Sequence, residues 1–462
     1  MIKQIGLIMS DSCGRKIYCI RDLRYTLPQL LLTSAIMILS GMAVSIFAFV
    51  VMNVKPIMLD RCGASATQIA LITGTLPQII NFFLCPVIST CSDKTRTRFG
   101  RRKPYLILTA PLVTLILVLI GFNGEIARFF CGIFPGKDPG MISFVLVSTL
   151  LVLFQFIFLF PGSVVWYLIA DVIPRECFGR YQAISSVVNT IVSSGLNFFV
   201  LDHAVNNMKP TFCIIGAGYL LIYVLQFFLV NEGTYEPVAD KIRSGGSWFR
   251  KSVDYVQLFF KQGFSCKIFL FLFLCMGLNQ ASNICRGMFN VLFATKEIGM
   301  SVAEYGKVMG WSMVISAAAI FYVGKLMDKY HPIMVYMISG FFIMAVNIFG
   351  YFLVYTPMTF TVIGIATALM YAVQNLAQTP LLVAILPMNK FGQLASVNSM
   401  VNSVVVFAAA YLGGYLTDYF GYRLMFIWDL AVTAMATAAL FVVYDQWKKA
   451  GGKAGYTPPQ LD

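Results

Sequence analysis

Apolar runs of about 20 residues recur along the whole chain, and each is long enough to cross ~30 Å of hydrocarbon as a helix. Charged residues make up only 12% of the sequence, against about 25% in soluble proteins. The sequence therefore predicts an all-α polytopic membrane protein. We predict twelve transmembrane helices, at 29–52, 67–88, 104–122, 143–169, 183–201, 211–231, 268–292, 302–324, 332–354, 359–386, 394–416 and 423–444.

Positive charge is concentrated on one side of these predicted helices. Most of the 34 Lys and Arg residues fall in segments on the same side as the N-terminus, and the net charge is +14. An excess of Lys and Arg in cytoplasmic loops orients membrane proteins. We therefore expect a cell (inner) membrane location with both termini in the cytoplasm. The lipid bilayer is then a partner, no nucleic acid is expected, and we predict a monomer.

Signals of an enzyme are missing from the sequence. The chain has no nucleophile elbow and no phosphate loop, and its 11 Cys and two His residues show no metal-ligand spacing. We therefore predict no catalytic residues, no metal site and no bound cofactor.

Two segments of the chain repeat one another. Residues 174–189 read "PRECFGRYQAISSVVN" and residues 387–402 read "PMNKFGQLASVNSMVN", with Pro, Phe-Gly, Ser and Val-Asn at one offset. An Asp-Lys pair follows the second predicted helix, at 93–94, and recurs after the eighth, at 328–329. The repeats predict two parallel six-helix bundles, 1–231 and 268–462, the second ending in a short cytoplasmic tail. Repeats of this kind bind substrate near the bilayer midplane.

The predicted linker at 232–267 contains one amphipathic stretch. In "SWFRKSVDYVQLFFK" (247–261) most apolar residues fall on one helical side and most charges on the other. This pattern fits a helix lying on the inner leaflet, and it fits equally the start of the seventh membrane helix.

The Asp-Lys pairs in a duplicated six-helix layout resemble the major facilitator superfamily. The stretch "SDKTRTRFGRRKPYLI" (92–107) is similar to the longer form of that loop in glycoside–pentoside–hexuronide:cation symporters and sucrose-type transporters. The segment "LIADVIPRECFGR" (168–180) also resembles the sucrose-type branch. The resemblance covers the layout of the whole chain and is strongest in these loops. It implies the major facilitator fold and secondary transport of a small molecule by alternating access.

The same resemblance implies a conformational latch in the loop after the second helix. A carboxylate at a helix end can accept backbone N–H bonds or pair with an Arg from a neighbouring helix. Such a contact holds two helix ends together in one conformation and breaks in the other. Anchoring the membrane topology could alone explain the positive charge, but not the order of the residues, and the two roles are compatible. The latch residues implied are Asp93, Arg98, Gly100, Arg101, Arg102 and Asp328.

Polar residues within the predicted helices mark a candidate substrate site. The seventh helix carries Asn279, Asn283, Arg286 and Asn290 at steps of 4, 3 and 4, and the tenth carries Thr367, Tyr371, Gln374 and Gln378 at the same steps, with Asn375 adjacent. These steps place each set on one helix face. Further candidates lie on the second, fourth and fifth helices: Gln78, Asn81, Gln155, Trp166 and Asn189.

These residue types suit a neutral sugar or glycoside. Amides both donate to and accept from hydroxyl groups, and aromatic rings cover the apolar face of a sugar. The alternative is that the amides join helices to one another, at about 0.6 kcal/mol each. A carrier for an amphiphile such as a lysolipid or drug, and a transport-inactive membrane sensor, are the rival functions.

The second predicted helix lacks the acidic residues that bind the coupling cation in a related sodium-coupled transporter. In the sodium-coupled melibiose permease, two Asp residues of the second helix carry the cation, and Asn81 and Cys85 stand at those positions here. The Asp that binds galactoside in that permease aligns with Leu159. Sodium coupling is therefore disfavoured, and we expect a proton-coupled or uncoupled carrier.

Arg286 and Asp429 are the two charges placed deepest in predicted helices. An unpaired charge in a membrane span costs at least ~2.5–3.5 kcal/mol, so each should have a partner. Three readings stay open. The two residues form an intramembrane ion pair, or Arg286 faces the cavity and binds an anionic hexuronide, or Asp429 couples transport to a proton.

Overall fold

The computed structural model describes residues 8–10, 16–20, 23–95, 97–134, 136, 138–233, 266–387 and 391–459. The amphipathic stretch at 247–261 and most of the predicted linker lie outside these residues. The internal contacts of the chain divide it into two compact units, Met1–Ala64 with Phe83–Ala239 and Ser65–Phe82 with Asp240–Asp462.

Long apolar helices make up nearly the whole of the described chain, which confirms the predicted fold class. Eleven helical stretches among the described residues are long and apolar enough to cross a membrane, as expected for a multi-pass membrane protein. The one predicted span not among these eleven is the eighth, 302–324, which falls in α14 (Val302–Tyr330). That helix has 29 residues but is not one of the eleven.

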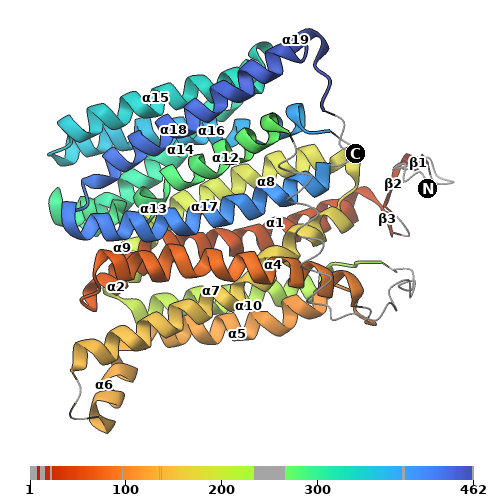
Figure 1. Ribbon diagram of the computed structural model, residues 1–462. Coiled ribbons are helices and arrows are strands. Elements are labelled where there is room, and N and C mark those ends of the chain that lie inside the picture. Colours follow the sequence, from red (N-terminus) through yellow and green to blue (C-terminus); the bar gives the residue numbers. More distant parts are fainter. Residues whose placement is uncertain are drawn as a thin grey trace, which may run out of the picture. The chain divides into compact units, whose positions relative to one another are not determined.

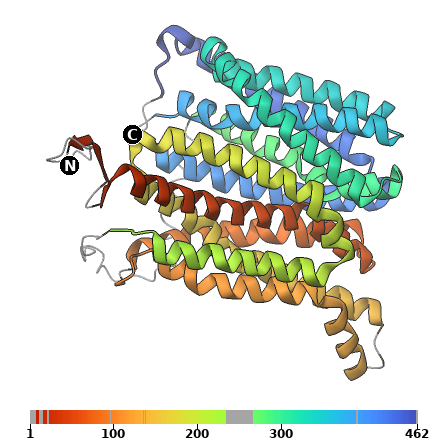
Figure 2. The ribbon, with the colours of Figure 1, turned by 180° about the vertical axis from the view of Figure 1, so that it is seen from behind.

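Five long helices form the framework of the first unit. They are α1 (Leu27–Phe49), α5 (Lys103–Gly121), α7 (Pro139–Val172), α8 (Arg175–Gly195) and α10 (Met208–Leu229). Helix α5 packs against both α7 and α10, and α1 packs against α8 and α10. The shorter α2 (Lys55–Arg61), α6 (Asn123–Ile133) and α9 (Leu201–Asn206) lie at one end of this unit (Figures 1 and 2).

Three short strands precede α1 at the opposite end of the same unit (Figure 1). Strands β1 (Ile8–Ser10), β2 (Lys16–Ile20) and β3 (Leu23–Tyr25) form an antiparallel sheet in that order. Tyr18 of β2 aligns with Ile8 on one side and Tyr25 on the other. The sequence analysis did not predict this sheet, because strands of three to five residues carry too little alternation to be recognised.

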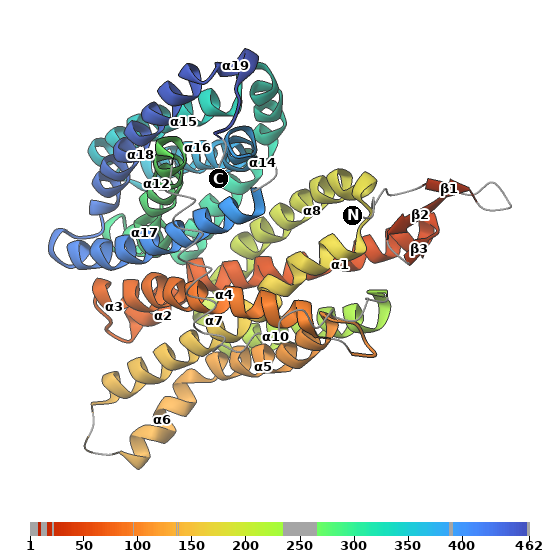
Figure 3. The ribbon, with the colours of Figure 1, turned by 45° about the vertical axis from the view of Figure 1, so that its right-hand side comes forward.

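The second unit is built around α12 (Lys267–Ser282), which packs against α17 (Phe391–Phe420) and α18 (Leu424–Lys449) (Figure 3). Helix α15 (Pro332–Leu353) packs against α16 (Pro357–Ile385) and α18. Its core contains large apolar side chains such as Phe269, Phe273 and Leu440. Helix α4 (Leu76–Lys94) crosses the boundary between the two units. The remaining helices of the second unit are α3 (Ala66–Ala70), α13 (Ile284–Leu292), α14 and α19 (Gly452–Gly455).

Single π turns interrupt four of the membrane helices: η1 (Val50–Val54), η2 (Leu71–Thr75), η3 (Leu196–Val200) and η4 (Phe293–Glu297). A π turn is wider than an α turn, closing i→i+5 hydrogen bonds. Because η1 joins α1 to α2, the first membrane helix runs without a break from Leu27 to Arg61, beyond the end predicted at residue 52.

Candidate functional site

The loop that leads into α5 is held by the carboxylate of Glu232, which follows α10. Backbone N–H groups of Arg101, Arg102 and Lys103 donate to this carboxylate at 2.7, 3.1 and 2.5 Å. They lie at the N-terminus of α5, where the helix dipole favours a negative charge. Gly100 has a φ of 108°, and a Cβ there would lie 2.5 Å from Glu232 Oε2. The turn therefore needs glycine.

Two guanidinium groups of the same loop pair with Asp171, near the end of α7. Arg101 Nη2 lies 2.8 Å from Asp171 Oδ2, and Arg102 Nε lies 2.5 Å from the same oxygen. Asp171 follows the membrane span, which ends at Ile169. Burial opposes ionisation of Asp171, but its bonds to Arg101 and Arg102 outweigh burial and hold the pKa of this carboxyl below its usual value. The loop thus ties together the ends of α5, α7 and α10.

Three of the six predicted latch residues, Gly100, Arg101 and Arg102, meet in this cluster. Arg98 is exposed and lies over the ring of Phe99 at 4.5 Å. The side chains of Asp93 and Asp328 are outside the described part of the chain.

Sequence reasoning missed both carboxylates of the cluster. Asp171 ends a long apolar run, and Glu232 is the first acidic residue after another. Both carboxylates follow an apolar run at the same membrane side as the basic loop of the same six-helix half, and this shared side was the one sequence feature that could have suggested the contact. Both residues are far from Arg101 along the chain, so the contact itself was not predicted.

A small pocket of about 150 Å³ lies in the first unit between α1, α7 and α8. It contains two predicted site residues, Trp166 of α7 and Asn189 of α8, with Ser45 and Ser185. Asn189 Nδ2 donates to Ser185 Oγ at 3.4 Å, whereas the buried Asn189 Oδ1 has no partner among the described residues. The Trp166 side chain is 54% exposed. The pocket therefore offers a free hydrogen-bond acceptor beside an accessible aromatic ring.

The polar residues predicted to share one face of the seventh helix (α12 and α13) and one face of the tenth (α16) include both exposed and buried side chains. Gln378 Oε1 of α16 accepts from Gln280 Nε2 of α12 at 3.3 Å, and Gln280 is exposed, as is Asn375. An amide exposed within a span is unfavourable in lipid, so these side chains indicate a hydrated surface. Asn279 and Gln374 are buried inside the unit. The sequence analysis missed Gln280, which lies directly beside Asn279.

A one-residue break interrupts the helix that carries Asn279, Asn283, Arg286 and Asn290. Asn283 separates α12 from α13 and has a ψ of −5°, which interrupts the regular turn. Asn283 and Asn290 are half-buried, and Asn290 Nδ2 donates to the Tyr305 hydroxyl at 3.4 Å. The prediction that steps of 4, 3 and 4 place all four residues on one face treated this segment as one unbroken helix.

Arg286 and Asp429 lie in a buried network in the second unit. Arg286 Nε donates to Asp429 Oδ2 at 3.0 Å, and Arg286 Nη2 donates to Asn347 Oδ1 at 2.7 Å. The Tyr371 hydroxyl donates to Asp429 Oδ1 at 2.9 Å. Asp429 is fully buried, and the guanidinium also lies 5.0 Å from the centre of the Phe426 ring. The network joins α13, α15, α16 and α18.

Lys55 is another buried basic group, and the sequence analysis did not identify it. Its side chain is fully buried in α2, and Nζ donates to Oε1 of the predicted site residue Gln155 on α7 at 2.5 Å. Two further predicted residues, Gln78 and Asn81, are half-buried on α4.

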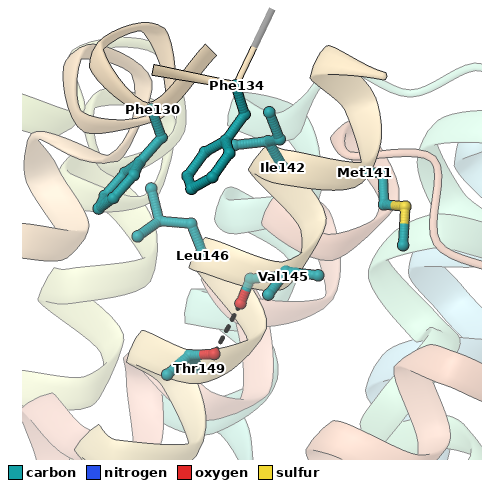
Figure 4. Close-up of a pocket in the computed structure, with 7 residues that line it drawn as sticks. All are labelled: Phe130, Phe134, Met141, Ile142, Val145, Leu146 and Thr149. Atoms are coloured by element: carbon teal, nitrogen blue, oxygen red, sulfur yellow. Dashed lines mark hydrogen bonds between the residues drawn. The ribbon is translucent and has the colours of Figure 1, made fainter. Parts of the chain in front are cut away.

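A wider pocket of about 360 Å³ lies between α6 and the start of α7. Figure 4 shows that apolar side chains surround it and that its one hydroxyl, on Thr149, is already bonded to the Val145 carbonyl, at 2.8 Å. This pocket has no free polar group for a sugar. Its wall is formed by Phe130, Phe134, Met141, Ile142, Val145, Leu146 and Thr149.

Comparison with known proteins agrees with this architecture. The family model described as Major Facilitator Superfamily matches residues 272–458. No curated protein is significantly similar to the chain in sequence.

Several solved transporters share the fold. A mutant of the nucleoside transporter NupG is similar with a TM-score of 0.67 and 14% identity, over 89% of this chain and 100% of that one. A bacterial homologue of the human lysosomal transporter Spinster is similar with a TM-score of 0.63 and 14% identity, over 94% of this chain and 98% of that one. A bacterial metal transporter is similar with a TM-score of 0.59 and 14% identity, over 90% of this chain and 99% of that one. The chain therefore has the major facilitator fold, and residues 272–458 match the sequence model of that superfamily.

Proposed function

We propose that the protein is a secondary carrier that moves a neutral polyhydroxylated solute, a sugar or glycoside, across a membrane by alternating access. The carrier function is supported by the major facilitator fold and by the match of residues 272–458 to its family model. The substrate class rests mainly on the pocket of Trp166 and Asn189.

The chemistry of that pocket supports a hydroxylated ligand. A buried oxygen without a partner carries a desolvation penalty of about 1–3 kcal/mol, which a donor from the ligand removes. Asn189 Oδ1 is such an oxygen, and Ser45 and Ser185 line the same pocket. The exposed Trp166 ring provides the flat apolar surface that covers one face of a sugar.

The hydrogen bonds of Arg286 bear on whether the substrate is neutral or anionic. A free Arg286 would favour an anionic hexuronide. Its guanidinium is instead neutralised by Asp429 and bonded to Asn347, which leaves less of it for a substrate carboxylate. This arrangement supports a neutral substrate.

Alternating access needs contacts that can break between states. The cluster of Glu232, Asp171, Arg101 and Arg102 joins three helix ends through charged hydrogen bonds at the edge of the spans. In our proposal it is the latch of the first six-helix half. Both termini are then cytoplasmic, as the positive charge predicts.

Sugar counterflow in proteoliposomes tests the proposal. Vesicles loaded with unlabelled sugar should take up labelled sugar without any ion gradient. Asn189→Ala should weaken substrate binding by about 1–3 kcal/mol, a 5- to 150-fold rise in the half-saturating concentration. Asn123→Ala, on α6 outside the pocket, is the matched control and should behave as wild type. Counterflow of a lysolipid but of no sugar would contradict the proposal and favour the amphiphile carrier.

A nucleoside is the second candidate substrate. It combines a hydroxylated ribose with a flat base that could stack on the exposed Trp166 ring. The similar fold of the nucleoside transporter NupG supports testing it. Competition by ribosides and not by hexoses would favour this reading.

A further inference from the structure

Lys55 differs from the other buried charged residues in the part of the chain that the structure describes. Arg102 pairs with Asp171, Arg286 pairs with Asp429, and Glu232 accepts backbone N–H groups. Lys55 has no oppositely charged partner among the described residues. Its one hydrogen bond there is to the neutral amide of Gln155.

The surroundings of Lys55 are poor in charge. It lies in the span Leu27–Arg61, six residues before its end, which corresponds to about 9 Å along a helix. Helix α2 packs against η1, which has no ionisable side chain, and against α7, and Arg61 at its end bonds to α9. Within its span, Pro139–Ile169, α7 has no Asp, Glu, Lys, Arg or His, and Tyr167 is its one ionisable group.

The ionisable residues of α2 itself and of α9 have other positions or partners. Asp60 lies on α2 itself, five residues beyond Lys55 and close to the end of the span. Asp202 and His203 belong to α9, which packs against η1. Asp202 Oδ1 accepts from Asn206 Nδ2 at 2.9 Å.

This environment suits an amine better than an ammonium. An ammonium carries three N–H donors and a charge whose burial without a partner costs several kcal/mol. A neutral amine carries no charge and two N–H donors, and Gln155 Oε1 accepts one of them. Lysine can lose its proton when it is buried, whereas arginine cannot.

We propose that Lys55, hydrogen-bonded to Gln155, is the proton-binding site that couples transport to a pH gradient. In this enclosed state the amine is neutral. When the carrier opens this region to water, the lone pair of Nζ takes a proton from one side of the membrane. When the carrier next opens this region to the other side, Nζ gives the proton up to water there and returns to the neutral amine. The inference rests on the proposed carrier function and adds the coupling ion and the residue that binds it.

Asp429, the other candidate coupling group, is less suitable. Its carboxylate is the counter-ion of the buried Arg286 and also accepts from Tyr371, so protonation would leave the guanidinium buried without a counter-ion. Protonation of Lys55 breaks no ion pair of this kind.

Lys55→Gln separates coupling from transport. It removes the proton site and keeps a group that can hydrogen-bond to Gln155. In proteoliposomes with a gradient of one pH unit and one proton per sugar, the wild type should accumulate sugar up to about tenfold. Lys55→Gln should keep counterflow and equilibrate sugar without accumulation, at any pH from 5.5 to 8.

Two further variants control this experiment. Lys55→Arg fixes the positive charge and should abolish accumulation as well. Arg61→Gln removes a cation at the end of the same span, where Arg61 bonds the Val205 carbonyl, and should leave the tenfold accumulation unchanged.

The outcomes distinguish the two proposals. Wild-type vesicles without any counterflow would refute the proposed function, and this inference with it. Wild-type counterflow with no response to a pH gradient, or full accumulation by Lys55→Gln, would refute only the role of Lys55. Loss of counterflow in Lys55→Gln with a raised half-saturating concentration would make Lys55 a substrate ligand and would also overturn the proton site.

Discussion

Replacing Asp429 by Asn should strongly destabilise the second unit. The carboxylate is fully buried and receives bonds from Arg286 Nε at 3.0 Å and from the Tyr371 hydroxyl at 2.9 Å. Asp429→Asn removes the negative charge and leaves the Arg286 guanidinium buried without a counter-ion. Breaking a buried pair in this way costs about 3–5 kcal/mol.

The expected shift in melting temperature follows from that energy. For a unit of roughly 200 residues each kcal/mol corresponds to about 2–4 °C, so Asp429→Asn should lower the Tm by about 6–20 °C. Tyr371→Phe removes a single charged hydrogen bond of about 1.5–3 kcal/mol and should have a smaller effect. Thermal unfolding of the purified protein in detergent, followed by tryptophan fluorescence, measures both.

Two controls make this result interpretable. Asp445→Asn breaks the exposed Asp445–Lys449 pair on the same helix, α18, and should shift the Tm little, because exposed pairs contribute about 1 kcal/mol at most. Arg286→Met combined with Asp429→Leu removes both charges and should recover part of the loss. A wild-type Tm for Asp429→Asn, or a double variant no more stable than the single one, would refute the reasoning.

Three further expectations concern the latch and the C-terminal segment. Gly100→Ala should slow sugar exchange and lower the Tm, because its Cβ would overlap Glu232 and its φ is 108°; wild-type values would contradict the assignment. Because the folded pKa of Asp171 lies below its usual 3.8, its contribution to stability is complete above about pH 5 and is lost as the pH falls below about 4. The Tm of Asp171→Asn should therefore lie below that of wild type at pH 7 and approach it at pH 3. Lys453→Ala removes the bond from Nζ to the Lys329 carbonyl at 2.9 Å and should increase proteolysis after residue 449, without changing substrate affinity.

Features that depend on length and hydropathy were predictable from the sequence, because each apolar run reports directly on one helix. The contact between Arg286 and Asp429 was also among the predicted alternatives, since few charges fall within apolar runs. Asn347 and Tyr371 could not be assigned as its further partners. Their bonds depend on how α15 and α16 pack against α13 and α18.

The sequence did not predict the burial of Lys55 or the contacts of Asp171 and Glu232, for physical reasons specific to each. Hydropathy placed the end of the first helix at 52, so Lys55 was counted as a residue outside the span. The helix continues through η1 and buries it. Asp171 and Glu232 are about 70 and 130 residues from Arg101 along the chain, and no pattern in one sequence reports contacts over such separations.

The π turn η1 sets the rotational register of everything that follows it in the first membrane helix. Lys55 is the first residue after this turn. A π turn accommodates one residue more than a regular helix, and one residue corresponds to about 100° of rotation. Deleting a single residue from 50–54 should restore a regular α-helix and turn the Lys55 side chain about a quarter of a circle away from Gln155. A one-residue insertion thus determines whether this helix presents its amine to α7.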